Sequence, residues 1–305
     1  MVYCGVSHRK VKITPVMHHA RLAVALGVVL CCITVAHGQP GAVTASEQVF
    51  ERVMAEARRT ALHEASLGSI MREVGLQLRG APYAAGLLDK PGEEELVVDL
   101  TQFDCVLYVE VVLAMALGVA LHDHGFGSFK ERLRSLRYRA GRMDGYCSRL
   151  HYFTEWIRDN EARGHVHDIT RSIGGVPLEK VLNFMSRHRD SYPRLAQSDS
   201  LFRGILEMER SLVEMALFHI PQDQIRLAYG ALRDGDILAM STSVEGLDVT
   251  HTGLAYAQPD GSFGMLHAST SGGVMVSPDL ADYVRANSVQ AGIIVARPVD
   301  PRHTR

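Results

Sequence analysis

Two segments far apart in the sequence carry the residues best suited to nucleophilic chemistry. Phe103-Asp104-Cys105 opens a long apolar run, and Asp248-Val249-Thr250-His251-Thr252-Gly253 opens an apolar strand-like run near the C-terminus. The partial positive charge at a helix N-terminus lowers the pKa of a thiol, and a neighbouring imidazole lowers it further. Because the thiolate is the nucleophile, the pair predicts acyl-transfer chemistry with Cys105 as nucleophile and His251 as base.

A third residue is needed to orient the imidazole, and His267 is placed to do so. It lies in Leu266-His267-Ala268-Ser269, after the turn sequence Gln258-Pro259-Asp260-Gly261. A hairpin through that turn brings facing side chains to about 5 Å, which permits contact between the two imidazoles. The expected site therefore follows the chain order Cys105, His251, His267.

Cys105 also has an inert interpretation, because a cysteine in an apolar helix is most often a core residue. Its position favours chemistry, since it begins the helix directly after Asp104, a residue able to cap it. A disulfide to Cys147 would exclude a nucleophile. We expect the two to remain unbridged, because the surroundings of Cys105 match a catalytic site and those of Cys147 do not.

The elements that must position these residues change in kind along the chain. Ala45 to Leu78 is predicted to be a helix, Glu95 to Leu100 a short strand, and Asp104 to Leu121 a buried helix. Residues from about 126 to 228 form a mainly helical insertion between Cys105 and His251. Short strands follow at Asp236–Ser241, His251–Ala257, Phe263–Ala268, Gly273–Ser277 and Ala291–Pro298. Helices followed by strands indicate an α+β fold, organised as one catalytic domain over residues 39–305.

The N-terminal region reads as a targeting segment. Leu22 to Ala36 carries no charge and follows a basic stretch, and it is too short for a comfortable membrane span. Small residues at Ala36 and Gly38 predict a signal peptide over 1–38, with translation starting at Met1 or Met17. We therefore expect an exported protein of the periplasm or cell envelope, with no stable membrane span after cleavage.

Composition narrows the choice of ligand. The formal net charge of −2 argues against nucleic acid as a partner. The pairs His122/His124 and His165/His167 lack a cysteine partner and lie in loop-like segments, so we expect no metal site and no cofactor.

Several motifs resemble those of NlpC-like cell-wall cysteine peptidases, which are papain-like α+β enzymes. They are, in order, Gly80-Ala81-Pro82-Tyr83, Phe103-Asp104-Cys105, His251-Thr252-Gly253-Leu254-Ala255-Tyr256 and Leu266-His267-Ala268-Ser269. The resemblance implies a nucleophile helix packed on an antiparallel sheet. It makes Cys105 the nucleophile, His251 the base, His267 the orienting residue and Tyr83 a residue lining the site. Val106 departs from the pattern, because Ser or Thr commonly follows the cysteine.

A closer resemblance is to a bacterial N-acetylmuramoyl-L-alanine amidase-like family, and it covers about residues 78–297. The shared segments are Arg149-Leu150-His151-Tyr152-Phe153, Trp156-Ile157, Asn183-Phe184-Met185-Ser186, Asp234-Gly235-Asp236 and Gly246-Leu247-Asp248-Val249-Thr250-His251. Each motif is weak alone, whereas several in the right order are specific.

The resemblance implies a peptidoglycan hydrolase that acts on peptidoglycan or muropeptides through a Cys-His-His thioester mechanism. The closer family implies N-acetylmuramoyl-L-alanine amidase activity, and the broader one a γ-D-glutamyl-diaminoacid endopeptidase of the stem peptide. Further alternatives are a non-catalytic wall-binding protein and an acyltransferase on the same fold. Candidate substrate-binding residues in the insertion are Arg149, Tyr152 and Trp156, with packing an equal alternative. Asp248 is another candidate, for which stabilisation of a turn is the simpler explanation.

Overall fold

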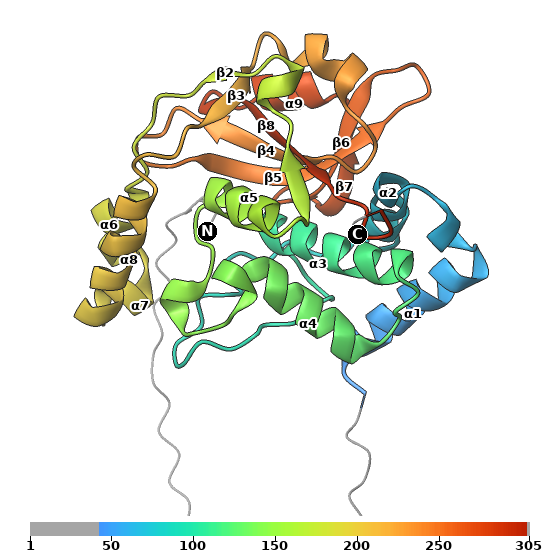
Figure 1. The fold of residues 1–305 in the computed structure, drawn as a ribbon, viewed down its shortest axis with the longest axis horizontal. Coiled ribbons are helices and arrows are strands. Elements are labelled where there is room, and N and C mark those ends of the chain that lie inside the picture. The colour runs from blue at the N-terminus through green and yellow to red at the C-terminus, as the bar shows by residue number, and fades with distance from the viewer. Residues whose placement is uncertain (1–42, 304–305) are drawn as a thin grey trace, which may run out of the picture.

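The computed structural model describes residues 43–303, which form a mixed α/β fold on an antiparallel sheet (Figure 1). The predicted signal peptide lies outside the described residues. Within 43–303, no helix is both long enough and apolar enough to cross a bilayer.

The sheet has eight strands in the order β2-β3-β8-β4-β5-β6-β7, with β1 also paired to β8. Their bounds are β1 Val166–Asp168, β2 Val176–Pro177, β3 Phe218–Pro221, β4 Ile237–Thr242, β5 Val249–Ala257, β6 Phe263–Ser269, β7 Gly273–Ser277 and β8 Gln290–Pro298. The five predicted strands correspond to β4 through β8. The predicted hairpin between His251 and His267 is also present, as β5 and β6 pair with Leu254 opposite Leu266.

The helices are α1 Ala45–Arg59, α2 Leu67–Gln77, α3 Cys105–Ala120, α4 Phe126–Arg137, α5 Phe153–Ala162, α6 Phe184–Arg187, α7 Pro193–Ala196, α8 Asp199–Ser211 and α9 Leu280–Arg285. α3 confirms the predicted buried helix, since almost its whole length is enclosed. Its charged exception, Glu110, is paired with Arg137 of α4.

Two expectations about elements were wrong. The helix predicted over 45–78 is divided, because Ala61 has a left-handed φ of 49° and Ser66 caps a second helix through Ser69. The strand predicted at 95–100 is absent. Its backbone groups bond to side chains instead, with Val97 O accepting from Arg137 Nη1 at 2.6 Å. The insertion was predicted to be mainly helical, and beside its helices it supplies the short strands β1, β2 and β3 to the sheet.

The two faces of the sheet are covered by different helices (Figure 1). On one face, α3 packs with α1, α2 and α4 against apolar side chains that include Leu254 and Leu266. On the other, α9 and the 3-10 helix Ile225–Ala231 cover side chains that include Met240 and Met265. A third apolar cluster lies within the insertion, around α6, α7 and α8. Successive side chains along β5 point to opposite faces of the sheet, so they are covered by different helices.

Candidate active site

Cys105 is the first residue of α3. The Asp104 side chain accepts a hydrogen bond from the Leu107 backbone N–H at 2.8 Å, and so caps the helix as predicted. Burial raises the pKa of the Asp104 carboxyl to about 6. Cys105 itself is 1% exposed, and within residues 43–303 neither it nor Cys147 forms a disulfide.

A small cavity of about 40 Å³ adjoins Cys105. Apolar lining comes from side chains such as Leu88 and Val106, and polar lining from Arg137, Arg149 and His151. The volume holds a few heavy atoms, because a single water needs roughly 10–15 Å³ on this measure. A thiol at a helix N-terminus therefore adjoins a mostly enclosed space that contains hydrogen-bonding groups.

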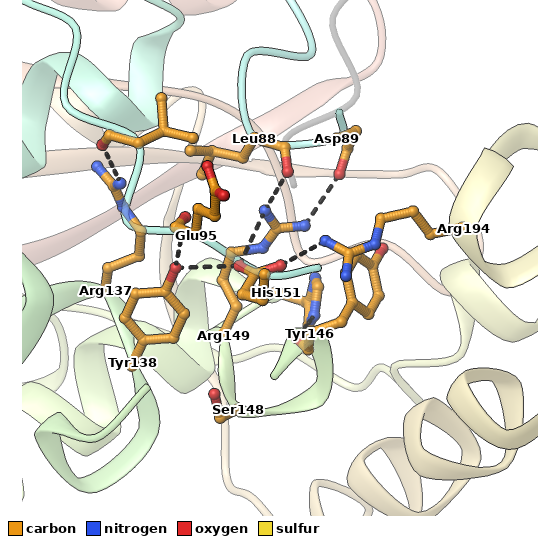
Figure 2. A network of polar contacts seen from close by, with 12 residues as sticks. Leu88, Asp89, Glu95, Arg137, Tyr138, Tyr146, Ser148, Arg149, His151 and Arg194 are labelled. Carbon is orange, nitrogen blue, oxygen red and sulfur yellow. Dashed lines mark hydrogen bonds and ion pairs between the residues drawn. The ribbon is translucent and has the colours of Figure 1, made fainter. Parts of the chain in front are cut away.

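Arg149 is the centre of a buried network beside this cavity (Figure 2). Its guanidinium donates to Leu88 O at 2.5 Å and to Asp89 Oδ1 at 2.9 Å, and it lies 3.5 Å from Glu94. Glu94 also pairs with Arg194 at 2.5 Å. Each cation thus has carboxylate partners, which a buried charge requires.

His151 lines the same cavity, and its tautomer follows from its hydrogen bond. The ring Nε2 lies 2.9 Å from Tyr146 O. A carbonyl oxygen only accepts, so Nε2 carries the proton and Nδ1 is the acceptor nitrogen. Burial, reinforced by the charge of Arg149, holds the pKa of His151 well below its usual range. The ring is therefore neutral at pH 7.

His251 and His267 contact each other as predicted. His251 Nε2 lies 2.7 Å from His267 Nδ1, and His267 Nε2 lies 2.9 Å from Ser277 Oγ. Burial lowers the pKa of His251 to about 3, with a further contribution from His267, and lowers the pKa of His267 to about 4. Both rings are neutral at pH 7, and Tyr283 of α9 packs against both.

With one arrangement of tautomers, the hydrogen-bonded series His251, His267 and Ser277 can accept a proton at His251. If His267 Nε2 donates to Ser277 and His251 Nε2 donates to His267 Nδ1, then His251 Nδ1 holds a lone pair. The arrangement matches the usual pattern in which a base is oriented by a third group.

The histidine pair projects from the face of the sheet that α9 covers. His251 is opposite Met240 in register, and Met240 packs in the core beneath α9. Directly paired residues on antiparallel strands share a face. Helix α3, which begins with Cys105, packs on the other face of the same sheet. The pairing of Cys105 with His251 stays a prediction.

The start of β5 nevertheless lies close to the surroundings of Cys105. Asp248, which precedes β5, accepts hydrogen bonds from Thr154 N at 2.8 Å and Thr154 Oγ1 at 3.0 Å. Thr154 follows closely on His151, which lines the cavity beside Cys105. These contacts join the start of α5 to the residue before β5, and His151, just before α5, shares the cavity with Cys105.

The remaining candidate residues differ in what surrounds them. Tyr83 forms a bridge with Phe103, two residues before the cysteine, and packs on the core. Tyr152 is buried and donates to Glu209 at 2.8 Å, and Trp156 is buried in the core, stacked on Phe153. Asp248 ties α5 to β5. Among the candidates from the insertion, Arg149 is the one that lines the cavity.

Arg137 was not identified from the sequence, although it lines the cavity and is buried. The signal that could have identified it is the lone Glu110 in the apolar run of α3, because a buried carboxylate needs a cationic partner.

Comparisons with known proteins place the chain in a family. The model of the AmiA-like family, described as N-acetylmuramoyl-L-alanine amidase-like, matches residues 73–293. No curated protein matches the sequence. The chain is 33% identical to a Bacteroides uniformis N-acetylmuramoyl-L-alanine amidase, with a TM-score of 0.73, covering 77% of this chain and 99% of that one.

Two other solved structures are similar. A Bacteroides fragilis protein, provisionally named a xylanase, is 33% identical with a TM-score of 0.69, covering 73% of this chain and 98% of its own. A Legionella pneumophila protein at 21% identity, with a TM-score of 0.62, shares the fold over 83% of this chain and 97% of its own. On the family match, which spans most of the sequence, the chain belongs to the N-acetylmuramoyl-L-alanine amidase-like family.

Proposed function

We propose that the protein is a cysteine hydrolase of peptidoglycan that cleaves the amide between N-acetylmuramic acid and L-alanine. Its core would be of the papain-like, NlpC-like kind. The observation that carries the proposal is the position of Cys105, at the capped N-terminus of α3 and against a cavity lined by hydrogen-bonding groups. Membership of the amidase-like family supports an amide as the bond that is cleaved. The cysteine supports a mechanism through a thioester.

The proposed reaction has two acyl-transfer steps. The Cys105 thiol passes its proton to His251, and the sulfur attacks the amide carbonyl carbon. The C–N bond breaks as His251 returns that proton to the leaving amine, and a thioester remains on Cys105. His251 then takes a proton from water as the water oxygen attacks the thioester carbonyl carbon. The C–S bond breaks, the carboxylic acid leaves, and the Cys105 thiolate takes the proton back from His251.

The contact between His251 and His267 supports these roles. His267 fixes the ring of His251 through the 2.7 Å hydrogen bond and is itself held by Ser277. A neutral His251 is the form that accepts a proton, and its lowered pKa maintains that form at pH 7. Tyr83 and Arg149 are the proposed substrate-lining residues. Tyr152, Trp156 and Asp248 are proposed to support the site from within the protein.

The proposed substrate is peptidoglycan or its muropeptides, and the proposed location is the periplasm or cell envelope after removal of residues 1–38. A cut after γ-D-glutamate is the second candidate. The broader motif resemblance that includes Tyr83 and His267 favours it. A product assay must also distinguish these two hydrolase activities from a catalytically inactive wall-binding protein and from an acyltransferase.

The test is mass spectrometry of purified muropeptides incubated with the protein. Amidase activity yields free lactyl-muramic acid ends and peptides that begin with L-alanine. We expect Cys105→Ala to lose at least ~10³-fold in rate and Cys147→Ala, the matched control, to retain activity. Xylan oligosaccharides serve as a second control substrate and should remain uncut.

Other products would redirect the proposal. Peptides ending in γ-D-glutamate would establish the endopeptidase, and new cross-links the acyltransferase. A product profile that does not differ between wild type and Cys105→Ala would rule out the cysteine mechanism.

A further inference from the structure

Arg137, the last residue of α4, has one guanidinium nitrogen without a hydrogen-bond partner among the residues that the structure describes. The side chain is 1% exposed. Its Nε donates to Glu110 at 2.7 Å and its Nη1 to Val97 O at 2.6 Å. Within residues 43–303, the buried Nη2 meets no acceptor. Leaving a buried charged donor unpaired is costly, so this nitrogen calls for a ligand or a water.

The cavity beside Cys105 is where such a ligand would bind. Arg137 and Glu110 both line it, together with the cysteine itself. Because the volume is about 40 Å³, the cavity has room for one amide group with a small substituent, and not for a sugar ring or a dipeptide. An oxygen bound to Arg137 here would therefore belong to the same group that meets the thiol.

The local charge indicates which kind of acceptor fits. Arg137 is already neutralised by Glu110, and Arg149 by Asp89 and Glu94. A ligand carboxylate would add an uncompensated buried charge, which is strongly unfavourable. A neutral amide carbonyl accepts the hydrogen bond without that cost. It can also develop negative charge during attack by the thiol.

We propose that Arg137 Nη2 donates a hydrogen bond to the carbonyl oxygen of the scissile amide and stabilises the oxyanion that forms there. This assignment rests on the proposed function, with Cys105 as nucleophile. A preorganised donor within a buried site acts most strongly on the transition state, so its loss lowers kcat more than it changes KM.

The decisive variant is Arg137→Met combined with Glu110→Leu. The single change Arg137→Met would leave Glu110 as a lone buried carboxylate and destabilise the fold, whereas the double change removes both charges together. We expect the double variant to unfold in urea close to wild type. We also expect kcat on muropeptides to fall roughly a hundred- to a thousand-fold, with KM within a few-fold. Arg134→Met, on the same helix and paired with Glu131, is the matched control and should retain kcat.

Each outcome decides one question. If the double variant is folded and retains wild-type kcat, Arg137 serves only to neutralise Glu110 or to bind a water, and the assignment is overturned. If the double variant is unstable, Arg137→Lys with Glu110 retained replaces it, because lysine keeps the charge while losing the guanidinium geometry. That variant should also lose kcat while remaining folded. If wild type itself yields no cleavage product, the proposed function fails independently of Arg137.

Discussion

At the scale of single residues, the Asp104 carboxyl group has two opposed effects on its neighbour Cys105. It caps α3, which holds the thiol at the helix N-terminus, and when ionised it places a negative charge next to that thiol. The charge disfavours the thiolate. Because burial raises the pKa of Asp104 to about 6, the charge is suppressed below that pH.

Asp104→Asn should separate the two effects, because asparagine caps a helix about as well as aspartate and carries no charge. The raised carboxyl pKa stabilises wild type fully below about pH 4, and that contribution disappears as pH rises through about 6. We therefore expect the variant to gain stability relative to wild type between about pH 4 and pH 8, as measured by urea unfolding. Solvent near the half-buried carboxyl reduces the size of the effect.

The buried histidine pair predicts the opposite dependence on pH. The folded pKa values of about 3 and about 4 lie below the ordinary value of 6.5, so the unfolded chain binds protons more readily. Their stabilising contribution is complete above about pH 6.5 and is lost as pH falls toward 4 and 3, by at most about 1.4 kcal/mol per pH unit for each ring.

Replacing one of the two histidines should reduce the dependence of stability on pH. We expect His267→Gln to lose less stability than wild type when the pH is lowered from about 7.5 to 5, measured by urea unfolding. His303→Gln, at an exposed position, is the control and should follow wild type. Parallel slopes in wild type and His267→Gln would contradict the lowered pKa of the pair.

The sequence identified residues whose main contacts come from neighbours in the sequence or from a single hairpin. It missed residues whose contacts come from distant segments of the chain. Cys105 was found because its capping residue is adjacent, and the contact of His251 with His267 because one hairpin sets it. Arg137 reaches the cavity only through the packing of α4 on α3. The face of β5 from which His251 projects depends on sheet register, and motif order does not determine it.

At the scale of elements, the loop between β4 and β5 is held by a single lysine. Lys180 Nζ donates to Thr242 O, to Val244 O at 2.9 Å and to Leu247 O at 2.8 Å. The last carbonyl of β4 and two carbonyls of the loop that follows thus share one ammonium group. Because this loop leads into β5, Lys180 helps to set where Asp248 and His251 lie.

Lys180→Met should therefore lower stability by about 2 kcal/mol or more, since charge-assisted hydrogen bonds to three backbone carbonyls are lost. We expect a lower Tm in thermal unfolding and a reduced kcat. Lys130→Met on the exposed side of α4 is the control. An unchanged Tm would show that water satisfies the three carbonyls equally well.

The strands that were predicted correctly are long and apolar, and those that were missed are short. β4 to β8 are each five or more residues long and apolar, and so are recognisable. β1, β2 and β3 have two to four residues, too few for a pattern. The segment at 95–100 has strand-like composition, yet Ser46 and Arg137 side chains satisfy its backbone in place of a neighbouring strand.

At the scale of the whole molecule, the insertion is built into the sheet. β1 and β3 come from the insertion and pair with β8 of the C-terminal region. Trp156, the single tryptophan in the sequence, lies in the insertion and packs in the main core. Such mutual burial favours unfolding as one cooperative unit.

Trp156 fluorescence and far-UV circular dichroism should consequently report one transition. We expect both signals to change at the same urea concentration, within experimental error. A tryptophan signal that changes at a lower concentration would mean that the insertion unfolds first and is a separate unit.

β8 also has a consequence for synthesis. It lies between β3 and β4 in the sheet, yet it follows both of them in the sequence. While the ribosome is still translating, β3 and β4 lack their shared neighbour, and the sheet remains in two parts with unpaired edges. Native pairing waits until β8 has been synthesised. A chain terminated before β8 would therefore stay open to chaperones and proteases, and only a product that includes β8 could complete the sheet.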